Sequence, residues 1–440
     1  MNSIQPSISP FFISNFFSSN KLPLIITMIF FFSMLYIDFF HHTVWSEQDG
    51  IYYYYNGKEF FDGNAQNIQI IGAPFGTSII YEVLNHFFAK PFEIAKGLSL
   101  ISGTVIVLVS YFIVKNIFSS KIAILSQVFI AINPRFQFLS FSALNELMPI
   151  ATIALSLYFL TKEHLKNSHI AIIGLLLGLS FMMRYQSIFI VLGILIFLFL
   201  RNKNHRQNLT YSVILILIFV ISASPMLIYN YLTYNNPMEN DTSFYLLALF
   251  KYQTPEWHES VQELRTEGIS TLFFNDPNLF LKNYLFNIFS HNPNKIFNFG
   301  TFDNLSLIPL IPFIGFITVT LGFFHVAKVS NDKRSLISLI ILGIVFFLVL
   351  LFGEFSEHYF AILFIPLLSL GILSINKIKT NFLPLLILSV VLFAFLSVIP
   401  VYRSYHFLLL LLPFSILNSI FLIEFLPKIF TKKSKGEKTI

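Results

Sequence analysis

Long apolar runs rich in Phe, Leu and Ile recur along nearly the whole of this 440-residue chain. A membrane-spanning helix needs roughly 20 predominantly apolar residues, and many of the runs reach or approach that length. Charged residues make up only 11% of the chain, whereas a soluble domain typically has about 25%. The sequence therefore predicts an all-α polytopic membrane protein and excludes an ordinary soluble domain.

We predict about twelve transmembrane helices. The first run is too long for a signal-peptide core and has no small-residue cleavage site after it, so it is kept as a span. The third, fifth and sixth spans are short, and eleven or thirteen spans are the alternatives if one short run is re-entrant. The predicted spans are 22–42, 97–115, 121–134, 143–160, 169–184, 186–200, 209–230, 306–327, 335–352, 358–375, 381–400 and 405–426.

The charges predict an orientation. With twelve spans, most Lys and Arg residues fall in the terminal tails or in the short loops on the terminal side, and most Asp and Glu residues fall on the other side. The positive-inside rule makes the terminal side cytoplasmic. We expect a multi-pass plasma-membrane protein with both termini in the cytoplasm; the absence of an obvious retention signal and of Cys favours this membrane over the endoplasmic reticulum.

The chain reads as one transmembrane domain, 1–440, with no internal repeat. Two outer segments, 43–96 and 231–305, are too long for simple connectors and should contain short helices. An amphipathic stretch near 77–88 should lie along the membrane interface, and Asn236-Pro237 should end a helix. Residues 427–440 form a basic cytoplasmic tail.

The most polar early segment, 45–55, follows the first span and contains Glu47 and Asp49. Carboxylates beside hydrocarbon are costly, and a partly desolvated Asp can take a proton from an attacking hydroxyl. The alternative is that Asp49 only marks a solvated loop. The sequence has no glycine-rich phosphate loop, no serine-nucleophile motif and no Cys, so nucleotide hydrolysis and thiolate chemistry are not indicated.

The order of these residues resembles the GT-C membrane glycosyltransferases, which include protein O-mannosyltransferases and aminoarabinose transferases. Those enzymes carry an acidic pair in the first outer loop, and Glu47-Gln48-Asp49 has that form here, followed by a Tyr cluster and Gly57. Their second outer loop resembles Asn133-Pro134-Arg135 followed by Ser142 to Glu146, where a helix ends at Pro and the next span begins.

Two later elements extend the resemblance. Gly174 to Ser180, running into Met183-Arg184-Tyr185, is similar to the family's Gly-Leu-rich helix and its basic end. Glu357-His358-Tyr359 before Pro366 is similar to a late Arg-Tyr element, although His358 stands where the family usually has Arg.

The resemblance implies a donor made of a sugar linked to a polyprenyl phosphate, membrane lipids around it, and a glycan, lipid or protein acceptor on the outer face. It implies no nucleic-acid partner. Asp49, assisted by Glu47, would be the catalytic base in an inverting transfer. Both carboxylates could instead hold Mg²⁺ or Mn²⁺, a choice that the spacing does not decide. The residues expected to bind substrate are Glu146, Arg184, Tyr185, His358, Tyr359 and Arg403.

Each of these assignments has a structural alternative. Glu146 could cap a helix, Arg184 could extend to the interface, and His358 could be a structural histidine. At the level of the whole protein, a lipid-linked glycan polymerase or ligase is the first alternative. A secondary transporter ranks lower, because acids gather at the outer rim, and Asp38 and Glu424 are almost the only acids well inside predicted spans.

Overall fold

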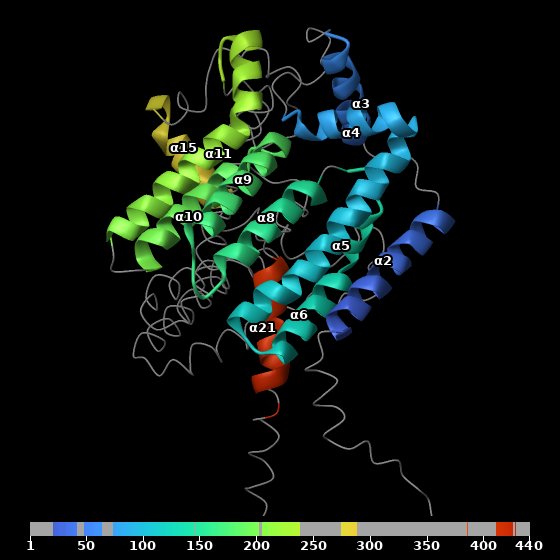
Figure 1. The fold of residues 1–440 in the computed structure, drawn as a ribbon, viewed down its shortest axis with the longest axis vertical. Helices are drawn as coiled ribbons and strands as arrows, with labels where there is room; N and C mark the ends of the chain where they lie inside the picture. Colours follow the sequence, from blue (N-terminus) through green and yellow to red (C-terminus); the bar gives the residue numbers. More distant parts are fainter. Residues whose placement is uncertain are drawn as a thin grey trace, which may run out of the picture.

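Every regular element in the described part of the computed structural model is a helix (Figure 1). The predicted spans 306–327, 335–352 and 358–375, and all of 381–400 except Leu385, fall outside the described residues. The residues that the structure describes are 21–41, 48–63, 74–144, 146–201, 205–237, 274–287, 385, 411–425 and 427.

Most of the described helices follow one another closely between the first span and residue 234. In chain order they are α2 (Lys21–His41), α3 (Gln48–Phe61), α4 (Gly76–Phe88), α5 (Pro91–Ile117), α6 (Ser120–Ala131), α7 (Pro134–Ser140), α8 (Leu147–Leu160), α9 (Asn167–Met183), α10 (Ser187–Arg201) and α11 (His205–Tyr234). Farther along lie α15 (Pro277–Phe286) in the large outer segment and α21 (Leu411–Ile420), which continues as the π-helical turn Phe421–Phe425.

Three described helices are long and apolar enough to cross a membrane, namely Lys21–Phe40, Pro91–Ile117 and His205–Thr233. They coincide with the predicted spans 22–42, 97–115 and 209–230. The predicted short spans are indeed short, at 12 residues for α6, 17 for α9 and 15 for α10. The total of twelve spans stays a prediction.

The predicted span 143–160 is too long at its start. Residues 141–144 and Glu146 are not helical, and α8 begins only at Leu147. Before these residues, α6 ends at Ala131, and Asn133 starts the separate short helix α7 by accepting from the Phe136 backbone N–H at 3.0 Å. Pro134 occupies the first position of α7, where its missing N–H does no harm.

The core of the described region is built by helices packed side by side, and α9 packs tightly against α11. A Cβ at Gly174 would lie 2.9 Å from the Leu215 carbonyl oxygen, and one at Gly178 would overlap Ser222. Small residues four apart let two helix backbones approach closely in a membrane. Ser222 Oγ adds a hydrogen bond to the Leu175 carbonyl at 3.0 Å.

Buried polar side chains on α6 join helices that are far apart in the sequence. Gln127 on α6 donates to the Pro23 carbonyl and to Thr27 Oγ1 on α2, both at 3.0 Å. Ser126 bonds Ser419 at 3.0 Å and so attaches α21 to α6, beside which it lies in Figure 1.

Helices α3 and α4 lie together at one end of the bundle (Figure 1). The amphipathic stretch predicted near 77–88 is therefore helical, as α4. Gly57 of α3 has no room for a Cβ against Ser78, and a Cβ at Gly76 would lie 2.6 Å from the Met182 carbonyl oxygen at the end of α9. α11 also ends at this end of the bundle, which we call the rim. There Asn235 takes a left-handed φ of 57°, directly before the predicted helix breaker Asn236-Pro237.

Candidate active site

Two of the predicted substrate-binding residues meet at the rim below α3 and α4. Arg184 Nη2 donates to Glu146 Oε1 and forms an ion pair with it. The Glu146 side chain is 4% exposed and that of Arg184 is 18% exposed. Because Glu146 immediately precedes α8 and Arg184 immediately follows α9, the pair joins the ends of these two helices.

The local geometry shows how the Glu146 carboxylate is used. Glu146 occupies the N-cap position of α8, yet its side chain accepts no capping hydrogen bond from the helix backbone. The carboxylate instead accepts from Arg184. Helix capping is therefore not the role of this side chain, and Arg184 is tied to a buried partner on another helix.

A pair of buried serines positions the backbone on both sides of the ion pair. Ser187 Oγ donates to Ser180 Oγ at 2.6 Å, and Ser180 Oγ donates to the Pro149 carbonyl in the first turn of α8 at 3.1 Å. The Arg184 backbone N–H donates to the Ser180 carbonyl at 2.7 Å. This network and the glycine contacts with α11 hold the end of α9, and with it the backbone of Arg184, against α8 and α11.

Tyr185, the third predicted residue that is described, faces α11. Its ring contacts Phe181 with a centroid separation of 5.1 Å. Asn230 Nδ2 lies 3.5 Å from the Tyr185 hydroxyl and 3.3 Å from the Pro237 carbonyl. Tyr185 therefore extends the polar rim from Arg184 toward the end of α11.

The sequence did not predict Tyr81, a residue of α4 that packs against residues next to the ion pair. It is 1% exposed and packs among Tyr53, Ala95, Met148 and Met183, from α3, α5, α8 and α9. Burial raises the pKa of the Tyr81 hydroxyl well above its usual range, and Tyr53 and Glu146 raise this pKa further. No local motif marks this tyrosine, because only the fold brings the four helices around it.

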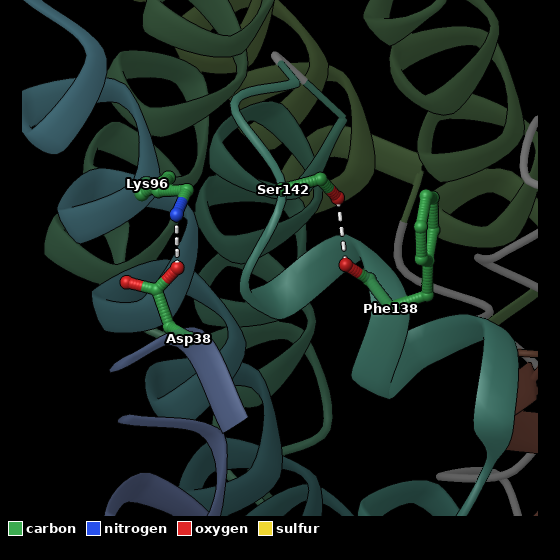
Figure 2. A network of polar contacts seen from close by, with 4 residues as sticks. All are labelled: Asp38, Lys96, Phe138 and Ser142. Atoms are coloured by element: carbon green, nitrogen blue, oxygen red, sulfur yellow. Dashed lines mark hydrogen bonds and ion pairs between the residues drawn. The ribbon is translucent and has the colours of Figure 1, made fainter. Parts of the chain in front are cut away.

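A second ion pair at the rim was also missed. Lys96 at the start of α5 pairs with Asp38 near the end of α2, as Figure 2 shows. The same view shows Ser142 Oγ donating to the Phe138 carbonyl at 2.6 Å. Asp38, one of the few acids inside a predicted span, is thus matched by a cation, which is not the arrangement expected of a free mid-membrane transport site.

The acidic segment is only partly described. α3 begins at Gln48, so Asp49 lies in the first turn of a helix and not in an irregular turn. Glu47, His358, Tyr359 and Arg403, and the side chain of Asp49, lie outside what the structure describes. Among the described residues, no three His, Asp or Glu side chains gather as a metal site would require.

Residues 73–229 match the protein family described as dolichyl-phosphate-mannose-protein mannosyltransferase. The matched segment runs from just before α4 to the last turns of α11. It contains Tyr81, Lys96 and the Glu146–Arg184 pair, and it excludes Glu47 and Asp49. No curated protein and no solved structure matches the chain.

Proposed function

Because the chain belongs to the family of dolichyl-phosphate-mannose-protein mannosyltransferases and is a multi-pass membrane glycosyltransferase, we propose that it transfers a sugar to an acceptor on the outer face of the plasma membrane. The family implies a dolichyl- or polyprenyl-phosphate sugar donor. The acceptor would present a hydroxyl or amine. The family match favours this function over the polymerase, ligase and transporter alternatives, and twelve spans with cytoplasmic termini would place the rim outside.

The observation that carries the proposal is the buried Glu146–Arg184 pair inside the family-matched segment. A guanidinium presents five donors in a planar fork that fits phosphate oxygens. Until a donor binds, Glu146 would hold that fork close to where the donor's phosphate arrives, and Tyr185 would line the site beside it. His358, Tyr359 and Arg403 would complete the phosphate and sugar contacts from the later part of the chain.

Asp49 would act as the general base. It would take the proton of the acceptor hydroxyl while the acceptor oxygen bonds to the anomeric carbon from the face opposite the phosphate. The bond from the anomeric carbon to the phosphate oxygen breaks, and polyprenyl phosphate leaves as an anion near Arg184. One displacement inverts the configuration. Glu47 would support Asp49, or both would hold Mg²⁺ or Mn²⁺.

The register of α3 supports a place for Asp49 near this site. Residues four apart lie on the same face of a helix, so Asp49 shares a face with Tyr53, and Tyr53 packs against Tyr81. Tyr81 in turn packs beside Met148 and Met183, which flank the ion pair in sequence. α3 therefore connects the acidic segment to the rim.

Transfer of labelled sugar from a panel of polyprenyl-monophosphate donors, by the purified protein in lipid, tests the proposal. Asp49→Asn should reduce transfer roughly 100-fold or more while donor binding persists, since a positioned base contributes about 10²–10⁴-fold. Asp62→Asn, at an exposed position directly after α3, should behave as wild type.

Full transfer by Asp49→Asn would show that Asp49 is not the base. Wild-type protein that uses only diphosphate-linked glycans would instead support the polymerase or ligase alternative.

A further inference from the structure

The Tyr81 hydroxyl is a buried polar group at this rim that the contacts of the described residues do not explain. It makes no hydrogen bond to the described residues, although the side chain is 1% exposed. Nearly all buried polar groups in proteins are hydrogen-bonded, and a phenylalanine would fill the same space without an unsatisfied hydroxyl. The hydroxyl therefore adds nothing to packing.

Its neighbours place the Tyr81 side chain close to the ion pair. Tyr81 contacts Met183, the residue before Arg184, and Met148, two residues after Glu146. Ala143, three residues before Glu146, packs against the same cluster. A tyrosine with an ordinary pKa of about 10 already keeps its proton at neutral pH, and burial raises the pKa of Tyr81 further, so its hydroxyl is a hydrogen-bond donor.

The binding of a phosphate creates a need for such a donor. The phosphate that links the lipid to the sugar is a diester with one negative charge, like a carboxylate, and its two free oxygens can compete with Glu146 for the Arg184 guanidinium. Whenever Arg184 turned toward the phosphate, the 4% exposed Glu146 carboxylate would lose its ion pair with Arg184, which is costly for a buried charge.

We propose that Tyr81 is a positioning residue whose hydroxyl donates to Glu146 when the donor's phosphate draws Arg184 away. This inference rests on the proposed function, because it assumes that a lipid-linked phosphate is the ligand. Tyr81 would thereby lower the cost of moving Arg184 from the carboxylate to the phosphate, without contacting the reacting atoms.

The test compares Tyr81→Phe with Tyr111→Phe. Tyr111 on α5 is as buried as Tyr81, and its hydroxyl also makes no hydrogen bond to the described residues. Tyr111 lies near Lys115, toward the other end of α5, roughly 22 Å along the helix from Lys96 at the rim. Affinity for polyprenyl monophosphate, the reaction product, is measured by binding and needs no turnover.

Tyr81→Phe should weaken polyprenyl-phosphate binding roughly ten-fold, as expected for loss of a hydrogen bond to a charged group. The KM for the donor should rise by a similar factor with kcat nearly unchanged, because the interaction persists from the bound state to the transition state. Tyr111→Phe should change neither. The Tm of Tyr81→Phe should not fall, because the variant removes a hydroxyl that is unsatisfied in the ligand-free protein.

In a Glu146→Gln background, Tyr81→Phe should have little further effect on binding. Equal binding by Tyr81→Phe and Tyr111→Phe, or an undiminished Tyr81→Phe effect in the Gln background, would overturn the inference. Because binding is measured on the product, these outcomes are distinct from a failure of sugar transfer. That failure would contradict the proposed function.

Discussion

The two ion pairs at the rim differ in what surrounds them. Glu146–Arg184 joins α8 to α9, with a 4% exposed carboxylate, a serine network beneath and Tyr81 alongside. Lys96–Asp38 joins α5 to α2, and the Asp38 side chain is 26% exposed. Most of α2 contacts little of the described protein, with 22% of its apolar window buried against 61% for α5.

The two ion pairs therefore lie in different surroundings. The pair on α2 holds a peripheral helix against the bundle and needs only complementary charge. The pair on α8 and α9 is held in position by contacts from several helices, more than are needed to join two helix ends. A substrate-binding site needs side chains that are held in this way.

Breaking each pair from one side gives the largest expected contrast. Arg184→Met leaves the Glu146 charge without its cation and should cost about 3–5 kcal/mol of stability, with loss of transfer. Lys96→Met should cost about 1 kcal/mol, because Asp38 is partly solvated. Unfolding in detergent measures both. Similar losses for the two variants would contradict the distinction.

Replacing both members of a pair separates stability from function. Glu146→Leu with Arg184→Met, and Asp38→Leu with Lys96→Met, should each fold about as stably as wild type, since apolar residues can substitute for a buried ion pair. The first double variant should lose transfer roughly 100-fold or more, and the second should retain it. Retained transfer by the first variant would exclude Glu146 and Arg184 from the site.

Glycines near the two pairs provide a smaller contrast. Gly178→Ala places a Cβ against Ser222 and 2.8 Å from the Phe219 carbonyl oxygen, so it should cost about 1–3 kcal/mol and reduce transfer by shifting Arg184. Gly97→Ala, beside Lys96, meets nothing within 4 Å and should stabilise α5 by about 0.5–1 kcal/mol. Thermal unfolding and transfer rates check both variants.

The smallest effect concerns the serine network. Ser187→Ala removes the hydrogen bond to Ser180 and should cost about 0.5–1.5 kcal/mol. Ser224→Ala on α11 removes an exposed bond to its own helix and should stay within about 0.5 kcal/mol of wild type. Equal unfolding temperatures for the two variants would show that the network does not fix the α9–α10 turn.

Local signals in the sequence predicted most of the described helices between residues 21 and 234. Asn133-Pro134 ended α6 and Asn236-Pro237 followed α11, because Pro and a preceding Asn act on the backbone within a few residues. The Gly174 and Gly178 pattern predicted a special helix, although its role in packing against α11 became visible only in the structure. The start of α8 was misplaced because the apolar run continues through the turn before Glu146.

The contacts of the candidate site are harder to predict from one sequence. Glu146 and Arg184 are 38 residues apart, and Asp38 and Lys96 are 58 apart. The choice of partner depends on which helix ends meet, and charge alone does not determine that. Tyr81 had no charge to mark it, and only the convergence of α3, α5, α8 and α9 distinguishes it from other tyrosines. The role of Asp49 remains a proposal.

The short helices have a consequence for what can approach the rim. At about 1.5 Å per residue, the 14 residues of α8 rise about 21 Å and the 15 of α10 about 23 Å, against roughly 30 Å of hydrocarbon. We therefore expect the ends that carry Glu146 and Arg184 to lie below the level of the lipid headgroups. A lipid-linked phosphate reaches that depth by sideways diffusion, whereas we expect a water-soluble acceptor to enter only as a thin, unfolded chain or a free sugar end.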